Sequence, residues 1–483
     1  MKNSDVKLIP VPKKVEGGED MFDIRSLSIF TKHSEWNDLL EGFRCSFQKI
    51  YEHDMKISED GIELIYDESV RKDGYLLEAN CGEIRLIASS NEGASYAFAT
   101  LLQLITQESS GFTMPAIKIE DYPDKDFRTL MVDLARLWHP ASTVYKYIDL
   151  CFLYKIKYLH LHFVDDPSYT LPSRAFERIS TVGKSYTFEE IASFVSYAKS
   201  RGVILIPEIE APGHATSLNR AYYNIFGNDP ISEDEEALVT ENGDSISNEA
   251  IVCAGKKSVT DALRVLLEEV CEMFPDSPYI HIGGDEANIQ SWNNCRHCKE
   301  YMKNHHIEDV GELYSDFVGR VAQIVLDLGR TPIVWEGFPK IGAHRVPRET
   351  VVIAWESHYN FADDLLDEGF QIINGSWQPL YIVPSMIQRW TPLDIMKWDV
   401  YNWQHWWEKS RATLNPIHLA PTEKVLGAQV SAWCCSYERE IPFVMENLAA
   451  LSERTWSVNR LCDDNQFINK HNVVMDKAAK LIL

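Results

Sequence analysis

Strand-like runs, each followed by an amphipathic helical stretch, recur eight times from about residue 127 onward. Each run is short, apolar and rich in β-branched residues, as expected for a buried parallel strand. Eight such repeats over roughly 330 residues predict a (β/α)8 TIM barrel with insertions, an α/β fold. The expected strands are residues 129–133, 158–164, 203–209, 279–282, 332–335, 351–355, 370–373 and 426–432, and helices are expected at 141–153, 188–201, 257–274, 313–328 and 361–368.

A doubly wound parallel sheet is the alternative fold with the same alternation of strands and helices. It favours a glycine-rich phosphate-binding turn after the first strand, and the sequence there is Asp-Leu-Ala-Arg at residues 133–136. The barrel is therefore the better prediction.

The first part of the chain has a different pattern from the rest. Strand patterns occur at 26–30, 61–66, 75–79 and 83–88, and a helical pattern occurs at 94–106. The turn-rich residues 121–124 then separate this part from the repeats. We expect a small α+β N-terminal domain at residues 1–122 and a catalytic barrel at residues 123–483.

Composition places the chain among folded globular proteins. Of 483 residues, 45% are hydrophobic and 25% are charged. The 47 basic and 72 acidic residues give a net charge of −25, which disfavours nucleic acid and anionic membranes as partners. We find no signal peptide pattern and no run long enough to span a bilayer. With ten cysteines and no secretion signal, we expect reduced thiols and a cytoplasmic location, although a mature secreted protein has the same kind of N-terminus.

One C-x-x-C pair invites comparison with zinc sites. Cys295 and Cys298 could supply two ligands, and His305 or His306 a third. The sequence has no second such pair, and a helical pattern runs through Cys298 and Tyr301. These features favour a packed helix, so no metal site is expected.

Two adjacent acids, Asp285 and Glu286, follow the fourth expected strand after Gly283 and Gly284. Consecutive strand residues point to opposite faces, and the glycines permit a turn that brings both carboxylates into one cavity. Repulsion between them would raise the pKa of one and keep it protonated as a general acid. The structural alternative is a polar junction between a strand and a loop.

Polar and aromatic residues also occupy the ends of the other expected strands. Because all parallel strands of a barrel end at the same face, these side chains should converge on one mouth. Aromatic walls with a few polar groups suit a sugar, which has apolar C–H faces and hydroxyl edges. The strand-end residues are Asp133, Arg136, His160, His162, Asp165, Asp166, Glu208, Glu210, His214, Trp335, Glu336, Trp355, Glu356 and Trp433.

Five ordered motifs run through these strand ends and the closing helix. They read DLAR at 133–136, LHLHFVDD at 159–166, PEIEAPGH at 207–214, HIGGDE at 281–286 with Trp292 beyond it, and SERTW at 452–456. With these motifs the chain resembles glycoside hydrolase family 20, the exo-β-N-acetylhexosaminidases. The resemblance covers nearly the whole chain, including a small α+β domain before the barrel.

The resemblance implies removal of terminal non-reducing β-linked N-acetylglucosamine or N-acetylgalactosamine, with retention assisted by the substrate. The 2-acetamido oxygen of the substrate would attack the anomeric carbon and form an oxazolinium intermediate. Glu286 would protonate the leaving oxygen and then deprotonate the incoming water. Asp285 would orient the acetamido group and stabilise the developing positive charge. The implied partner is an oligosaccharide or glycoconjugate, with no metal or organic cofactor, and the sequence allows a homodimer.

Motif position also suggests roles for other residues. Arg136 would bind sugar hydroxyls through its planar donor fork, and His214 with Asp165 would tune Glu286. The structural alternatives are a surface ion pair between Arg136 and Asp133 and a loop-capping histidine. The side chains expected to line the sugar pocket are Trp335, Trp355, Trp377, Tyr381 and Trp433.

Three positions depart from the family pattern. Glu210 replaces an aspartate, and the tyrosine expected soon after the seventh strand is displaced to Tyr381. Two cysteines follow Trp433 where an acid is common, with Glu438 as a candidate substitute. These departures leave the choice between gluco and galacto sugars open. The tryptophans of residues 390–407 form either a wall for the leaving group or a packed loop.

Two other functions remain alternatives at the level of sequence. The first is an N-acetyl-sugar-binding barrel with weak or lost catalysis, which the departures suggest and the retained acid pair argues against. The second is a metal-dependent hydrolase that uses His281, Asp285 and His214. Loss of activity on chelation would favour the second alternative.

Overall fold

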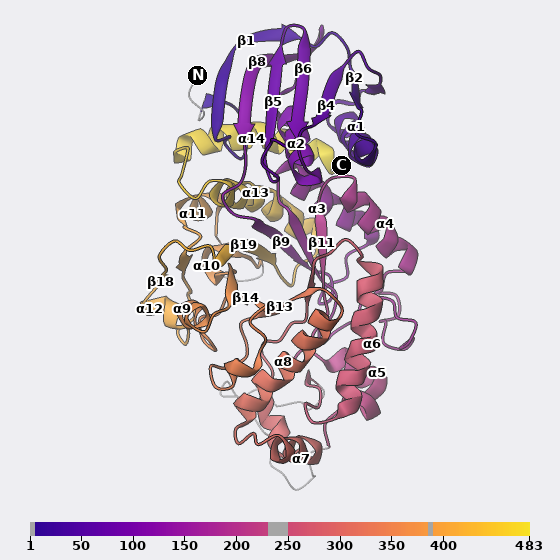
Figure 1. Ribbon diagram of the computed structural model, residues 1–483, viewed down its shortest axis with the longest axis vertical. Helices are drawn as coiled ribbons and strands as arrows, with labels where there is room; N and C mark the ends of the chain where they lie inside the picture. Colours follow the sequence, from indigo (N-terminus) through magenta and orange to yellow (C-terminus); the bar gives the residue numbers. More distant parts are fainter. Residues whose placement is uncertain (1–4, 230–249, 385–389) are drawn as a thin grey trace.

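The computed structural model describes residues 5–229, 250–384 and 390–483. An N-terminal sheet lies above a parallel barrel in Figure 1. The N-terminal sheet has the strand order β1-β8-β5-β6-β4-β2-β3, with β7 paired to β8. Its strands are β1 (Lys14–Asp23), β2 (Ser28–Thr31), β3 (Lys56–Ile57), β4 (Ile62–Tyr66), β5 (Tyr75–Asn80), β6 (Glu83–Ala88), β7 (Thr106–Glu108) and β8 (Gly111–Asp121).

The helices α1 (Asn37–Tyr51) and α2 (Asn91–Leu104) complete the predicted α+β architecture. The C-terminal helix α14 (Asp464–Leu481) packs against α1 and α3, so the end of the chain returns to the N-terminal sheet (Figure 1). The sequence analysis predicted β2, β4, β5, β6 and α2 but not β1, β8 or α1. β1 is mostly exposed and contains two glycines, and β8 contains a proline, so neither shows a clear alternating pattern.

The barrel consists of eight parallel strands, as the sequence predicted. Their order is β15-β14-β13-β12-β11-β10-β9-β19, and pairing of β15 with β19 closes the cylinder. Every residue of β9 and β10 is buried, because each strand packs against helices outside and side chains inside. The strands are β9 (Phe127–Asp133), β10 (Tyr158–His162), β11 (Ile204–Glu208), β12 (Tyr279–His281), β13 (Thr331–Trp335), β14 (Val351–Ala354), β15 (Gln371–Asn374) and β19 (Val425–Ala432).

Helices connect the barrel strands and extend some of the loops. Thr187 begins α4 with a capping box, in which its hydroxyl accepts the Glu190 N–H and the Glu190 carboxylate accepts the Thr187 N–H. The helices are α3 (Ala141–Leu153), α4 (Phe188–Lys199), α5 (Thr216–Phe226), α6 (Lys257–Met273), α7 (Arg296–Asn304), α8 (Val310–Asp327), α9 (Ala362–Asp367), α10 (Trp377–Leu380), α11 (Pro392–Lys397), α12 (Arg411–Leu414) and α13 (Tyr437–Trp456). Short elements are η2 (Ser34–Trp36), η4 (Ile289–Asn293), η5 (Ala343–Arg345), β16 (Tyr381–Ile382), β17 (Asn402–Trp403) and β18 (Ile417–His418).

The register of the barrel strands places the polar residues at the strand ends at the same level along the barrel axis. His162 on β10 pairs with Asp133 on β9 and with Glu208 on β11, and Glu208 pairs with His281 on β12. Below this polar layer the interior is apolar, with Phe127, Met131, Tyr158, Ile206 and Ile333 in one buried cluster. The barrel therefore presents its polar groups at the carboxyl ends of the strands.

Buried polar contacts join the N-terminal domain to the barrel. Lys155 forms a buried ion pair with Asp121 at 3.1 Å, and the indole of Trp456 donates to the same carboxylate at 2.8 Å. The Val11 N–H donates to Glu453 at 2.8 Å. Within the described ranges, no helix is both long and apolar enough to cross a membrane.

Candidate active site

The acid pair lies where β12 ends and the backbone turns sharply. Gly283 and Gly284 have φ angles of 67° and 95°, and Glu286 also has a positive φ of 46°. Two neighbouring loops press against this turn, because a Cβ on Gly213 would lie 2.6 Å from the Asp285 carbonyl oxygen. A Cβ on Gly337 would lie 2.4 Å from the Asp285 Cα. Close packing of glycine backbone from both sides therefore fixes the position of Asp285.

The two acids have different surroundings. Asp285 is only 8% exposed and its Oδ1 has no hydrogen-bond partner in the described structure, whereas the Glu286 side chain is 47% exposed. Burial, with added repulsion from Glu286 and Glu208, raises the pKa of Asp285 to about 7. The sequence analysis expected repulsion to leave one acid protonated and assigned the acid role to Glu286. In the structure it is Asp285 whose pKa is raised, and the pKa of Glu286 is lowered.

His214 explains why the pKa of Glu286 moves the other way. Its Nε2 lies 3.2 Å from the Glu286 carboxylate, and its Nδ1 lies 3.5 Å from Asp165. Burial would lower the pKa of His214, but hydrogen bonds to Asp165, Asp166 and Glu286 raise it well above its usual value. Burial alone would raise the pKa of Glu286. The hydrogen bond to the charged His214 imidazole outweighs this effect of burial, so the pKa of Glu286 is lowered. The expected Asp165–His214–Glu286 chain is therefore present.

Arg136 lies at the end of β9 and contacts two carboxylates. Its guanidinium is 2.8 Å from Asp165 and 3.4 Å from Asp133, and it lies over the Trp433 ring with 4.8 Å to the centroid. A quarter of the side chain remains exposed. The sequence analysis left open an ion pair between Arg136 and Asp133. The structure shows this contact, and Arg136 also contacts Asp165, the carboxylate that pairs with His214.

A glutamate and three histidines form the layer under the acid pair. Glu208 is fully buried; it contacts His162 directly and accepts the Trp335 indole N–H at 2.6 Å. His281 and His160 approach the same carboxylate at 2.7 and 3.1 Å. The sequence analysis placed His160, His162 and Glu208 among the strand-end residues expected at the mouth, but gave Glu208 no individual role. Its position at a strand end was the available signal.

Glu210 lies next to the acid turn. A Cβ on Gly283 would lie 1.6 Å from the Glu210 Oε2, so the carboxyl group occupies the space that a side chain at position 283 would need. Burial, reinforced by the charges of Asp285 and Glu208, raises the pKa of Glu210 well above its usual value. The extra methylene relative to aspartate is thus accommodated by a glycine on the neighbouring strand end.

The five aromatic residues named in the sequence analysis form one cluster near the carboxyl ends of the barrel strands. Tyr381 stacks on Trp377 with 4.2 Å between centroids and lies parallel to Trp355 at 6.0 Å. Trp433 lies 5.7 Å from Trp335, which is only 1% exposed and forms the floor of the site. Burial, with added effects of the charges of Glu356 and Asp285, raises the pKa of Tyr381 well above its usual value.

The sequence analysis interpreted the tryptophans of residues 390–407 either as a wall for the leaving group or as part of a packed loop, and the structure divides them between the two. Trp398 and Trp403 are buried and donate their indole N–H groups to backbone carbonyls. Trp406 is half-buried and packs edge-on against Trp377 at 5.8 Å. Residues 385–389 lie outside the described residues.

Some sequence candidates are not brought to the site. Glu438, the candidate substitute for an acid after β19, is exposed in the first turn of α13, and Cys434 lies beside Arg136 instead. His281 belongs to the Glu208 cluster, whereas His214 groups with Asp285 and Glu286. The three residues of the metal-hydrolase alternative therefore do not form one group.

Two further strand-end acids, to which the sequence analysis gave no individual role, lie near the mouth. Glu336 accepts backbone N–H groups of Trp355, Ser357, His358 and Tyr359 at 2.8–3.2 Å, which fixes the loop after β14. Burial and the charge of Glu286 raise the pKa of Glu356 to about 8.

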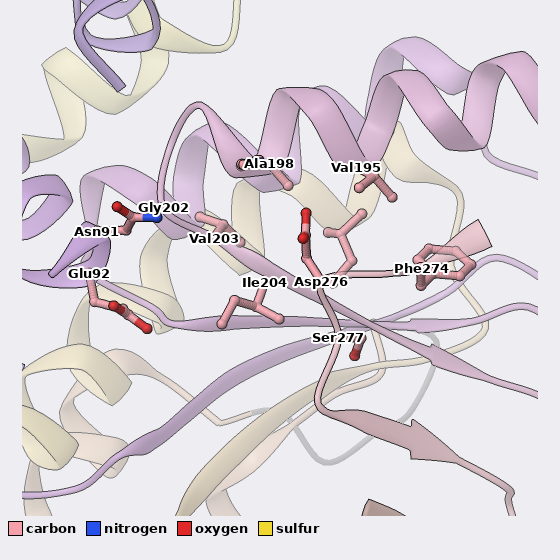
Figure 2. A pocket seen from close by; sticks show the side chains of 12 residues that line it. Asn91, Glu92, Val195, Ala198, Gly202, Val203, Ile204, Phe274, Asp276 and Ser277 are labelled. Atoms are coloured by element: carbon pink, nitrogen blue, oxygen red, sulfur yellow. The ribbon is translucent and has the colours of Figure 1, made fainter. Parts of the chain in front are cut away.

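A separate cleft of about 290 Å³ lies at the opposite end of the barrel (Figure 2). It is lined by Val203 and Ile204 at the start of β11, by Asp276 and Ser277 before β12, and by the first residues of α2. Catalytic groups in barrel proteins lie at the carboxyl ends of the strands, so this cleft at their amino ends is distinct from the candidate site.

Fold and site together define a TIM barrel with one buried and one half-exposed acid under an aromatic mouth, a geometry suited to carbohydrate. Two family profiles match the chain: glycosyl hydrolase family 20, catalytic domain, at residues 126–459, and glycosyl hydrolase family 20, domain 2, at residues 5–122. The chain belongs to glycosyl hydrolase family 20.

Curated relatives and solved structures agree with this assignment. A β-hexosaminidase of Porphyromonas gingivalis is 25% identical over 497 residues, which cover 94% of this chain and 60% of that protein. A β-hexosaminidase of Akkermansia muciniphila is 31% identical over 315 residues, covering 61% of each. The match thus spans about 60% of the length of both relatives.

Two structural neighbours show the same fold. The GH20 exo-β-N-acetylglucosaminidase of Vibrio harveyi, solved in complex with N-acetylglucosamine, superposes with a TM-score of 0.82 at 22% identity, over 98% of this chain and 77% of that one. The β-N-acetylhexosaminidase of Bacteroides fragilis superposes with a TM-score of 0.78 at 22% identity, over 96% and 93%.

Proposed function

We propose that this protein is an exo-acting β-N-acetylhexosaminidase. It removes a terminal non-reducing β-linked N-acetylglucosamine or N-acetylgalactosamine from an oligosaccharide or glycoconjugate, with catalysis assisted by the substrate. Family membership, the names of the relatives and the geometry of the acid pair support this activity.

The observation that carries the proposal is the buried Asp285 carboxylate. Its Oδ1 has no hydrogen-bond partner in the described structure, although the group is only 8% exposed. An unsatisfied buried acceptor is costly, and an N–H donor from a ligand would remove that cost. The acetamido N–H of the substrate is such a donor. Asp285 would then hold the acetamido oxygen towards the anomeric carbon and stabilise the positive charge of the oxazolinium ring.

Glu286 is placed for proton transfer to the leaving group. It is half exposed, whereas Asp285 is buried, so it reaches the open side of the site. The pKa of the neighbouring His214 is raised, so its imidazole is protonated, and its Nε2 lies 3.2 Å from the Glu286 carboxylate. His214 and Glu286 therefore share one proton. Passage of that proton from His214 to Glu286 arms the acid, and Asp165 stabilises the imidazolium that forms when the proton returns.

The position of the two acids on consecutive residues fits a substrate nucleophile better than an enzyme nucleophile. One oxygen of each carboxylate lies within 4.8 Å of the other, on consecutive residues of one turn. Two acids that flank a glycosidic bond stand about 5–5.5 Å apart in retaining enzymes and about 6.5–9.5 Å apart in inverting enzymes. Adjacent acids can serve a substrate nucleophile, because Asp285 would hold the acetamido group that attacks one face of the anomeric carbon while Glu286 protonates the leaving oxygen on the opposite face.

The test is release of nitrophenol from the nitrophenyl β-glycosides of N-acetylglucosamine, N-acetylgalactosamine and glucose. Wild type is run beside Asp285→Asn, Glu286→Gln and the exposed control Glu438→Gln. Hydrolysis of the acetamido sugars alone, reduced about a hundredfold or more in the two site variants and unchanged in the control, supports the proposal.

Other outcomes point to the alternatives. Equal turnover of the plain glucoside refutes neighbouring-group catalysis. Binding of N-acetylglucosamine without turnover of any glycoside identifies a sugar-binding barrel. Activity that disappears with a chelator and returns with a divalent metal identifies a metal-dependent hydrolase.

We further propose a reducing compartment such as the cytoplasm for this protein. All ten cysteines are free thiols in the structure, and several are buried. Free thiols persist where glutathione keeps them reduced. Alkylation of intact cells before lysis, followed by mass spectrometry, should find the exposed Cys81 and Cys434 modified as thiols, and a mixed disulfide at these positions would oppose this location. A homodimer stays a prediction.

A further inference from the structure

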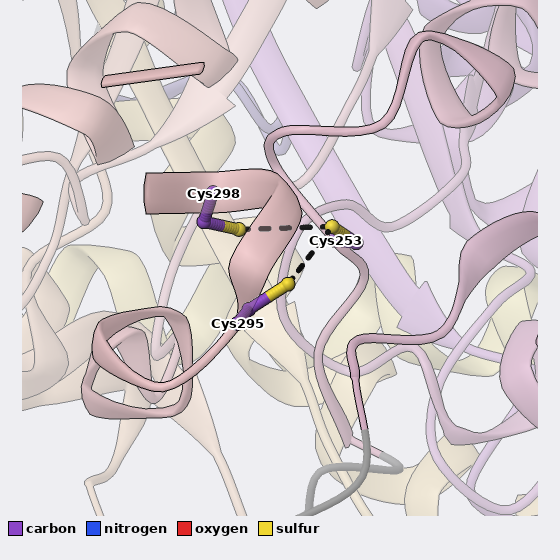
Figure 3. A group of neighbouring side chains, drawn as sticks. All are labelled: Cys253, Cys295 and Cys298. Atoms are coloured by element: carbon purple, nitrogen blue, oxygen red, sulfur yellow. Dashed lines mark hydrogen bonds between the residues drawn. The ribbon is translucent and has the colours of Figure 1, made fainter. Parts of the chain in front are cut away.

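Three cysteines meet in a buried cluster away from the acid pair. The Cys253 Sγ lies 3.5 Å from the Cys295 Sγ and 3.6 Å from the Cys298 Sγ. All three side chains are at most 1% exposed, and their sulfur atoms lie within 4.8 Å of one another. Figure 3 shows the three sulfurs converging from two segments of the chain.

The two segments are held together by their backbones. Cys295 is the N-cap residue of α7 and Cys298 lies in its first turn, where the helix dipole favours a thiolate. Cys253 lies before α6, more than forty residues earlier. A Cβ on Gly255 would lie 2.2 Å from the His297 carbonyl oxygen, so only glycine permits this approach.

We propose that Cys253, Cys295 and Cys298 bind one Zn²⁺ as thiolates. Zn–S bonds of about 2.3 Å at tetrahedral angles place the sulfurs about 3.8 Å apart, close to the separations found here. A disulfide would use two of the sulfurs and leave the third without a role, whereas a soft divalent metal uses all three. Binding releases the thiol protons to solvent and transfers no electrons.

The surroundings supply a fourth ligand of oxygen type. The Asp229 Oδ2 lies 3.8 Å from the Cys295 Sγ and accepts the Arg296 N–H at 2.7 Å, so its carboxylate already faces the cluster. Asp229 completes a Cys₃Asp site by a small movement, and a water molecule is the other ligand that an open fourth position takes.

The sequence analysis expected no metal here and considered His305 or His306 as the third ligand. Both histidines are exposed, and His305 stacks on Tyr301 with 4.0 Å between centroids. The third sulfur comes instead from Cys253, which local spacing could not reveal.

The cluster joins the loops that carry His214 and Glu286, the two groups between which the proton passes. The Val252 N–H donates to the Pro212 carbonyl at 3.0 Å, next to the loop of His214. The Val252 carbonyl accepts the Trp292 indole N–H at 2.9 Å, within the loop that follows Glu286. A metal at the three sulfurs therefore fastens the loop after β11 to the loop after β12 and holds His214 against Glu286.

Metal analysis of the full-length protein, purified under reducing conditions without chelator, tests the site. We expect about one Zn²⁺ per chain by elemental mass spectrometry. After removal of zinc, titration with Co²⁺ should produce the charge-transfer absorption of cobalt thiolates at one equivalent. Cys253→Ser and Cys295→Ser should each reduce bound zinc at least tenfold, and Asp229→Ala should weaken binding only if its carboxylate is the fourth ligand.

Matched cysteines control for loss of a thiol alone. Cys151→Ala removes a buried thiol and Cys81→Ser an exposed one, and both variants should retain the metal. If the cluster variants fail to fold, the wild type still decides, because chelation should lower its melting temperature and added Zn²⁺ should restore it.

Three results would overturn the site. They are wild-type protein with less than about a tenth of an equivalent of zinc and no cobalt–thiolate absorption, unchanged absorption in Cys253→Ser, and a Cys253–Cys295 disulfide in the freshly isolated protein. These readouts do not depend on glycoside hydrolysis, so they separate this proposal from the proposed function.

Discussion

Replacement of Gly283 by alanine should disrupt both the stability of the barrel and its acid pair. The φ of 67° lies in the left-handed region, which costs a residue with a Cβ about 1–2 kcal/mol. The new Cβ would also lie 1.6 Å from the Glu210 Oε2 and 2.2 Å from its Cδ. Overpacking of this kind adds about 1–3 kcal/mol, so the free energy of unfolding should fall by about 2–5 kcal/mol.

Two variants separate these contributions. Gly329 has a φ of 74° with nothing within 4 Å of the position that a Cβ would occupy, so Gly329→Ala should cost only the backbone part. The double variant Gly283→Ala/Glu210→Ala removes the clash and should recover part of the loss seen in Gly283→Ala, after allowance for Glu210→Ala alone.

Urea denaturation followed by tryptophan fluorescence measures the unfolding free energies. The same proteins should be assayed on the nitrophenyl glycoside of N-acetylglucosamine, because displacement of Glu210 and the acid turn should lower kcat/KM of Gly283→Ala at least tenfold. If Gly283→Ala matches Gly329→Ala in stability and wild type in activity, the packing of Glu210 over Gly283 is not what fixes the acid turn.

Two further predictions concern titration. His214 lowers the pKa of both Asp285 and Glu286. His214→Asn should therefore move the acidic limb of the pH profile of kcat/KM to higher pH by about one unit or more. A lower plateau of kcat/KM with an unshifted acidic limb would show that His214 has a purely structural role. Burial raises the pKa of Glu440 to about 8, although it accepts the Tyr147 hydroxyl at 2.6 Å. Because the folded pKa lies above the unfolded one, this acid contributes stability below about pH 4.5 that is lost as pH rises to about 8. Glu440→Gln should therefore gain on wild type by about 1.4 kcal/mol per pH unit across that window in urea denaturation at pH 5 to 8, and a constant difference would contradict the prediction.

The sequence alone determined the barrel and the level of its site. Strand and helix periods are local properties of the chain, so the eight repeats and most strand bounds could be predicted from them. Parallel strands of a barrel end at one face, so the residues at those ends could be expected to meet, as Arg136, Asp165, His214 and the acid pair do. The N-terminal strands β1 and β8 escaped prediction because exposure, glycine and proline blur their alternation.

Tertiary structure decided the properties that depend on distance across the chain. Asp285 rather than Glu286 has the raised pKa, because burial outweighs the charge of His214 at Asp285, whereas the hydrogen bond from His214 outweighs burial at Glu286. Glu210 fits because Gly283 on the next strand end leaves room for it, and Cys253 meets Cys295 only after two loops have packed together. Burial and electrostatic interactions depend on which residues are neighbours in space. The order of residues in the sequence does not give those neighbours, because they meet only when the barrel closes.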